Sequence, residues 1–248
     1  DDGHGLYISN GSDFNIVRGN ELHSNVSSDF QINADPFSTC DDVGIASSGC
    51  DALAGTGEGG AGASDFMLVE GNFFHHGLAQ GANFTSVRRS VVRNNIFGMY
   101  ARHGVSFWQE TTNTRLASSD NTIHHNLFIA TNTRPMLQLQ SGASRNDVRN
   151  NIFVGASVSG ANVTALAGAV AQNVESSAVG NAFAGNFYAS AGLGGRTPGA
   201  GEVARPDFDP KWFARFPAAA AGARALDLQP TATSPFRDVA PLLVETMV

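Results

Sequence analysis

A six-residue pattern recurs along the chain and constrains its fold more than any other feature. The pattern is an aliphatic residue, two variable residues, an asparagine, one variable residue, and an aromatic or aliphatic residue. Its six copies are Val17–Leu22, Val69–Phe74, Val92–Phe97, Ile123–Phe128, Val148–Phe153 and, more loosely, Ala178–Phe183. Successive asparagines lie 52, 23, 31, 25 and 30 positions apart, which fits a unit of about 23 residues with variable insertions. Such a chain is built of similar units that stack on one another.

Each unit also contains a second short strand in which apolar and polar residues alternate. These strands are Leu6–Ile8, Phe30–Ile32, Ala82–Phe84, Val105–Phe107 and Leu137–Leu139. The alternation sends leucine, isoleucine, valine and phenylalanine inward and the intervening residues outward. No stretch of the first 185 residues combines sustained helical periodicity with helix caps. We therefore predict parallel strands that stack unit upon unit.

The repeated asparagine has a chemical reason in such a stack. It sits at a tight bend between strands, tolerates a left-handed backbone, and offers its side-chain amide to the equivalent asparagine of the next coil. Two residues further on in each copy, we predict an aromatic stack in the interior. Its members are Phe74, Phe97, Phe128, Phe153 and Phe183.

Two segments near the start of the chain, His4–Ser9 and Ile16–Asn25, resemble the right-handed parallel β-helix repeat of the pectate-lyase-like superfamily. The resemblance covers roughly residues 4–186. It implies an all-β fold, a single-stranded right-handed parallel β-helix that forms a solenoid of about six coils.

The resemblance also divides the chain. We expect β-helix coils over residues 1–186, with a loop insertion at residues 34–64, and an irregular C-terminal tail at residues 187–248 that covers the end of the helix. Within the tail, Ala225–Pro230 and Ser234–Asp238 are similar to the closing segment of many bacterial members. The chain enters a coil at residue 4 without a capping helix. We therefore expect further N-terminal coils or a partner at this uncapped N-terminal edge.

Charge and composition exclude some partners. The net charge is −7, and no basic residues cluster, which excludes nucleic acid as a partner. No run approaches the roughly 18 apolar residues of a membrane span. Lys211 is the only lysine and lies outside the repeat, so the coils offer no lysine base. Cys40 and Cys50 suit either a disulfide or two separate thiols, and a disulfide would indicate a secreted, periplasmic or cell-surface protein.

The outward positions of the alternating strands predict a binding surface. Proteins of this fold commonly hold a polysaccharide along one strand face, because parallel strands display side chains about 4.8 Å apart. Amides, hydroxyls and an aromatic ring suit sugar hydroxyls and sugar rings, whereas an inert solvated face is the alternative. The outward residues are Tyr7, Ser9, Gln31, Asn33, Asn83, Thr85, Ser106, Trp108, Gln138 and Gln140.

The candidate catalytic residues flank this face. His4 and His103 occupy matching positions before their strands, and each precedes a glycine. If stacking brings them together with Tyr7, Arg102 and Asp29, they supply an acid, a base and a cation for a uronate carboxylate. Histidines that are hydrogen-bonded within turns are the alternative.

We therefore expect a secreted carbohydrate-active protein, most simply a lyase or epimerase that acts on uronic-acid-containing polysaccharides and requires no cofactor. A non-catalytic glycan-binding or adhesive module, or a fragment of a larger assembly, is the alternative. An inverting glycoside hydrolase ranks lower, because the aspartate pattern of such enzymes is absent.

Two other groups of residues raise the question of a metal. The insertion carries Asp35, Asp41 and Asp42, whose carboxylates suit Ca²⁺, although a solvated acidic loop is the alternative. His75–His76 and His124–His125 are adjacent pairs. Because neighbouring residues of a strand point to opposite faces, we expect neither pair to form a transition-metal site.

Overall fold

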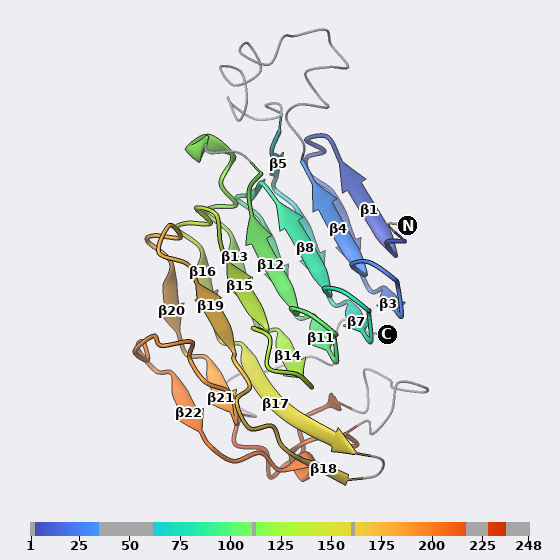
Figure 1. Cartoon of the computed structure of the whole chain (residues 1–248), viewed down its shortest axis with the longest axis vertical. Coiled ribbons are helices and arrows are strands. Elements are labelled where there is room, and N and C mark those ends of the chain that lie inside the picture. The colour runs from blue at the N-terminus through green and yellow to red at the C-terminus, as the bar shows by residue number, and fades with distance from the viewer. Residues whose placement is uncertain (1–2, 35–61, 111–112, 160–161, 217–227, 237–248) are drawn as a thin grey trace, which may run out of the picture.

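The computed structural model describes residues 3–34, 62–110, 113–159, 162–216 and 228–236, and these form a β-helix with three long parallel sheets (Figure 1). Sheet A contains β1 (Leu6–Ser9), β4 (Phe30–Asn33), β8 (Ala82–Thr85), β12 (Val105–Trp108), β15 (Leu137–Leu139) and β19 (Gln172–Val174). Sheet B contains β2 (Ile16–Arg18), β6 (Leu68–Glu70), β10 (Val91–Arg93), β13 (Thr122–His124), β16 (Asp147–Arg149) and β20 (Ala182–Ala184). Sheet C contains β3 (Glu21–His23), β7 (Phe73–His75), β11 (Ile96–Gly98), β14 (Leu127–Ala130), β17 (Ile152–Ser159), β21 (Phe187–Ala189) and β22 (Val203–Arg205).

The described residues contain five smaller elements besides these strands. β5 (Ser64–Asp65) pairs with β9 (Val87–Arg88), and β18 (Asn162–Ala165) is antiparallel to the long strand β17. The other two elements in the described part of the chain are 3₁₀ helices, η1 (Thr114–Leu116) and η2 (Pro210–Trp212).

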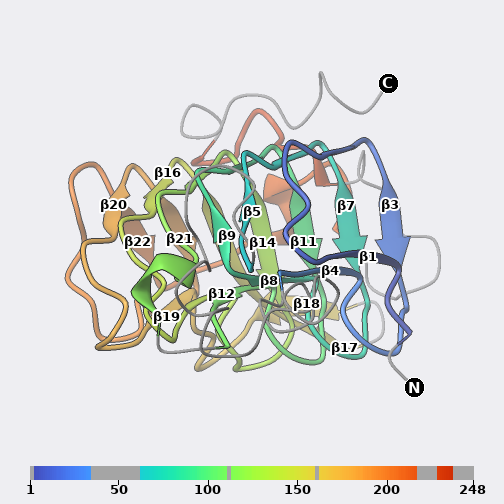
Figure 2. The same cartoon turned by 90° about the horizontal axis from the view of Figure 1, so that it is seen from above.

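The chain visits the three sheets in turn, so each coil contributes one strand to each sheet. The coils follow one another from the blue N-terminal end to the orange end in Figure 2. Sheets A and B each contain six strands, and all neighbours within them are parallel. The predicted all-β solenoid of about six coils is therefore confirmed.

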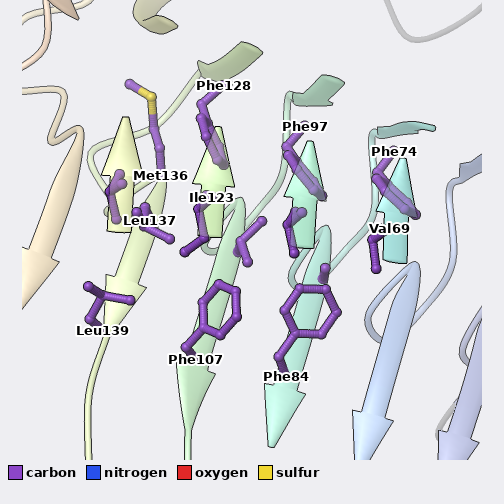
Figure 3. Packing of buried hydrophobic residues seen from close by; sticks show 14 of the residues in the cluster. Val69, Phe74, Phe84, Phe97, Phe107, Ile123, Phe128, Met136, Leu137 and Leu139 are labelled. Atoms are coloured by element: carbon purple, nitrogen blue, oxygen red, sulfur yellow. The ribbon is translucent and has the colours of Figure 1, made fainter. Parts of the chain in front are cut away.

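The interior is filled by equivalent residues of successive coils. The rings of Phe74, Phe97, Phe128 and Phe153 are stacked, with centroids 5.0, 5.2 and 4.7 Å apart. Figure 3 shows the first three of these rings in the same orientation on consecutive strands. Burial of such large apolar side chains is the main source of stability in a solenoid, because each coil packs only on its neighbours.

The last member of the aromatic stack differs from our prediction. Tyr188 stacks on Phe153 at 5.2 Å, whereas Phe183 lies opposite Val148 in sheet B. The sixth copy of the repeat is therefore Phe183–Tyr188 and not Ala178–Phe183. The two candidates overlap and both contain an asparagine at the fourth position, so the pattern alone did not separate them.

A ladder of asparagines joins the coils at the bend between sheets B and C. The Oδ1 of every asparagine after the first accepts hydrogen bonds from the backbone N–H and the Nδ2 of the preceding asparagine, at 2.9 to 3.1 Å. Its members are Asn20, Asn72, Asn95, Asn126, Asn151 and Asn186. Asn181, which we expected here, instead belongs to a second ladder with Asn121 and Asn146 between sheets A and B.

The C-terminal end of the first ladder meets a buried carboxylate. Glu202 Oε1 accepts hydrogen bonds from Asn186 Nδ2 at 2.8 Å and from the Tyr188 hydroxyl at 2.6 Å. The guanidinium of Arg196 forms an ion pair with Glu202 and lies 4.1 Å from the centre of the Phe183 ring. These contacts satisfy the polar groups that a further coil would otherwise satisfy.

Arg196 and Glu202 thus lie at the end of the helix, and other described residues after 187 extend or pack on sheet C. β21 and β22 extend sheet C, and the aromatic residues that follow pack on the outer face of that sheet. Trp212 and Phe236 both contact Phe187, with ring centroids 6.5 and 5.3 Å apart. Many outer residues of sheet C are apolar, among them Phe73, Ile96 and Leu127, and they share a buried cluster with the tail, which explains this placement.

The insertion lies between β4 and β5, after a strand of sheet A. Cys40, Cys50, Asp35, Asp41 and Asp42, the residues expected to form a disulfide or to bind Ca²⁺, lie outside the described residues.

The asparagine ladder makes a direct prediction for stability. Asn95→Ala leaves the buried backbone N–H and Nδ2 of Asn72 and the carbonyl of Val69 without their partner, so we expect a loss of about 3 kcal/mol in the free energy of unfolding. Asn20→Ala, at the exposed end of the ladder, is the control and should lose less than about 1 kcal/mol. Urea unfolding measures both. Equal losses would contradict the ladder as the source of the effect.

Candidate functional site

The outer face of sheet A carries two rows of uncharged polar side chains. The pairing register aligns Tyr7, Gln31, Asn83, Ser106 and Gln138 in one row, which Asn173 of β19 continues. The second row contains Ser9, Asn33, Thr85 and Trp108. Gln140 lies next to this row, because its backbone N–H donates to the carbonyl of Phe107, the residue before Trp108. No outward residue of these six strands carries a charge. Asn173 was not predicted from the sequence, although the segment Gln172–Val174 shows the same alternation of inward and outward residues.

Some of these side chains bond to each other, and others have polar atoms without a partner. Asn83 Nδ2 donates to Gln31 Oε1 at 2.9 Å, and Gln138 Nε2 donates to Gln140 Oε1. Within the described part of the chain, four shielded atoms on this face make no hydrogen bond. They are Asn33 Oδ1, Thr85 Oγ1, Ser106 Oγ and Trp108 Nε1. An unpaired buried polar atom costs about 1–3 kcal/mol, so this face carries unsatisfied hydrogen-bonding capacity.

A groove of about 520 Å³ opens at the N-terminal end of this face. Gly3, His4, Tyr7, Gln31 and Asn33 line it. The Tyr7 side chain is 48% exposed, and its ring centroid lies 5.2 Å from that of His4. The groove therefore combines an exposed aromatic ring with two amides, within the size range of small-molecule sites.

The structure does not bring the two candidate catalytic histidines together. β4 and β8 separate the strands that follow His4 and His103, a distance of about 14 Å at the usual strand spacing. Tyr7 is therefore beside His4 and Arg102 is beside His103, on different coils. Equivalent positions of a parallel β-helix share a line along its axis, and only adjacent coils place them in contact.

Both histidines are hydrogen-bonded to the backbone of the next coil. His4 Nδ1 lies 3.3 Å from the Ser28 carbonyl oxygen, and His103 Nδ1 lies 3.2 Å from that of Pro135. Because a carbonyl only accepts, each Nδ1 is the donor and each Nε2 carries the lone pair when the ring is neutral. Burial lowers the pKa of His103, against the effect of the Pro135 hydrogen bond, and the nearby Arg134 and Arg102 lower it further. Arg134 was not among the residues singled out from the sequence.

Comparison with known proteins agrees with the fold. The family model described as a right-handed β-helix region matches residues 1–187. The chain belongs to the right-handed β-helix family. No curated protein matches the chain. Membership supports the pectate-lyase-like fold, which carbohydrate-active proteins use, and by itself assigns no reaction.

Other features of this β-helix bear on metals and membranes. Among the described residues, no three His, Cys, Asp or Glu side chains converge to hold a metal ion. No helix in the same part of the chain has the length and apolarity needed to cross a membrane.

Asp29 lies beneath the face of the β-helix and not on it. Its side chain is fully buried at the start of β4, where Asn25 Nδ2 donates to Oδ1 at 2.7 Å and the Tyr100 hydroxyl donates to Oδ2 at 3.2 Å. Burial raises the pKa of Asp29 to about 6, although both hydrogen bonds oppose the shift. A carboxyl in this position supports the turn and does not touch a ligand on the outer face.

This buried carboxyl predicts a pH dependence of stability. Since the pKa of Asp29 is about 6 in the folded state and 3.8 as its ordinary value, its contribution is full below pH 4 and is lost as the pH rises through 6. Asp29→Asn removes this loss. We expect the stability of the variant relative to the parent to rise by about 2 kcal/mol between pH 4 and pH 7. Urea unfolding at several pH values measures the difference, in which the histidines common to both proteins cancel. A difference that does not change with pH would refute the assignment.

Proposed function

We propose that this protein binds an uncharged polysaccharide along the outer face of sheet A. The groove beside Tyr7, lined by the amides of Gln31 and Asn33, carries the proposal. An exposed aromatic ring packs against the apolar face of a sugar, and amides both donate to and accept from sugar hydroxyls.

The length and chemistry of the face support a polymer as the ligand. The aligned row from Tyr7 to Gln138 crosses five strands, about 19 Å at the usual strand spacing. Amides and a hydroxyl continue along it without a charged group, and the indole of Trp108 lies in the second row beside it. A neutral glycan satisfies such a row, whereas a polyanion finds no cation on it. A polysaccharide partner also favours a secreted, periplasmic or cell-surface location.

Tyr7→Ala tests the groove. Loss of the stacking surface should weaken binding of a neutral polysaccharide about tenfold, a change of about 1.4 kcal/mol, as measured by affinity electrophoresis and calorimetry. Ile16→Ala is the matched control, because Ile16 is 63% exposed on β2 of the same coil but belongs to sheet B. The affinity should vary little with salt. No binding of any neutral polysaccharide, or equal effects of the two variants, would overturn the proposal.

A second candidate, elimination from a uronic-acid-containing polysaccharide, is favoured by the surroundings of His103. Arg102 and Arg134 both lie close enough to affect its pKa, and either cation suits a uronate carboxylate. In this reaction His103 Nε2 removes the C5 proton, the C4–O bond breaks, a C4–C5 double bond forms, and water protonates the departing oxygen. An epimerase would instead return a proton to C5.

His103→Gln tests the elimination. We expect it to abolish the ultraviolet absorbance that unsaturated products generate from an acidic polysaccharide, because the glutamine amide is not a base and cannot take the role of Nε2. His4→Gln is the control, since His4 forms the equivalent hydrogen bond three coils away and should leave the rate unchanged. If no acidic polysaccharide yields unsaturated products, the second candidate is wrong and the binding function is unaffected.

A further inference from the structure

The two pairs of adjacent histidines have a geometry that the strand rule does not predict. His75 Nδ1 lies 2.7 Å from His76 Nδ1, and His124 Nδ1 lies 2.6 Å from His125 Nδ1. The second histidine of each pair has a positive φ, 57° for His76 and 55° for His125. The left-handed backbone ends the strand and turns the second ring toward the first, so the expectation of opposite faces is wrong for both pairs.

The first pair is held by a carboxylate. His75 Nε2 lies 3.0 Å from Glu21 Oε1 of the neighbouring coil, and the His23 ring stacks on that of His75 at 4.9 Å. Because a carboxylate only accepts, Nε2 of His75 carries the proton, and its Nδ1 presents a lone pair to His76. A carboxylate behind an imidazole in this way orients the ring and raises its basicity as a metal ligand.

The second pair has the same nitrogen separation in a different electrostatic setting. In sheet B, His124 is aligned with Arg93 on one side and Arg149 on the other. Burial is the main cause that lowers the pKa of His124 and of His125, and the positive charge of the two guanidinium groups lowers both further. The same charge opposes the binding of a cation. The molecule therefore contains its own control for the first pair.

We propose that His75 Nδ1 and His76 Nδ1 bind a divalent transition-metal ion, with Glu21 holding His75 in place. Imidazole nitrogen suits Cu²⁺, Ni²⁺ and Zn²⁺, and Cu²⁺ binds most tightly in this series. Bonds of about 2.0–2.1 Å require the two nitrogens to separate by a few tenths of an ångström, which the partly exposed His76 ring allows. Water fills the remaining positions, consistent with the absence of a third protein ligand among the described residues.

The protonation states balance without an added reactant. Before binding, one proton lies between the two Nδ1 atoms and belongs to His76, because His75 uses its own proton for Glu21. On binding, His76 changes tautomer and carries its proton on Nε2. Both rings stay neutral, and both Nδ1 lone pairs face the metal.

The test is titration of the untagged chain with Cu²⁺, followed by calorimetry and by electron paramagnetic resonance of the bound ion. His76→Asn removes one ligand while keeping a residue that tolerates positive φ, and His125→Asn makes the same change in the other pair. We expect the parent and His125→Asn to give a spectrum with two nitrogen ligands, and His76→Asn to lose it. Glu21→Gln should weaken binding by about 10- to 100-fold.

Other outcomes would overturn the proposal. They are no binding at millimolar Cu²⁺, a nitrogen signal that survives His76→Asn, or a signal that His125→Asn removes. Thermal unfolding of each variant without metal checks that the fold is intact, so that a lost signal is not a misfolded chain. If His76→Asn proves unstable, Glu21→Gln and His125→Asn alone still decide, because the proposal requires a weaker affinity in the first and the parent affinity in the second.

Discussion

The hydrogen bonds between asparagines of successive coils determine how the rest of this molecule is arranged. Every Oδ1 after that of Asn20 accepts two hydrogen bonds from the coil before it. The Nδ2 of Asn72, Asn95, Asn126 and Asn151 also donates to a backbone carbonyl of that preceding coil. An error of one residue in register would leave several of these buried groups unpaired. The ladder therefore fixes the register, and the register fixes which side chains share the outer face of sheet A.

Much of the fold could be predicted from the sequence because its two periodicities report directly on packing. The repeat gave the coils, and the alternation gave the inward and outward residues of β1, β4, β8, β12 and β15. The last coil could not be placed, because Asn181 and Asn186 both fit the pattern and only their hydrogen bonds separate them. The tail could not be placed either, since the apolar outer face of sheet C has no distinctive period of its own.

For the candidate site, the sequence predicts the face of the sheet on which a side chain lies but not the coil to which it belongs. Alternation predicts that Tyr7 and Gln138 share a face, but it carries no information on how many coils lie between them. His4 and His103 therefore matched in sequence while two strands separate their coils. The sign of the backbone φ angle could not be predicted from the sequence either. The positive φ of His76 and of His125 brings each ring into contact with that of the histidine before it. Asp29 was named from the sequence, but its burial and its raised pKa could not be predicted, because they depend on residues far away in the sequence, such as Tyr100.

The aromatic tail on sheet C changes the physical character of the solenoid. A stack of coils with contacts only between neighbours behaves as a one-dimensional array, in which either end can open while the middle stays folded. Phe208, Trp212 and Phe213 belong to the same buried cluster as Phe73 of the second coil and Phe187 of the sixth. A single segment thus connects coils that do not touch each other. Opening one coil disturbs the packing shared by several, so the tail converts a linear array into one cooperative unit.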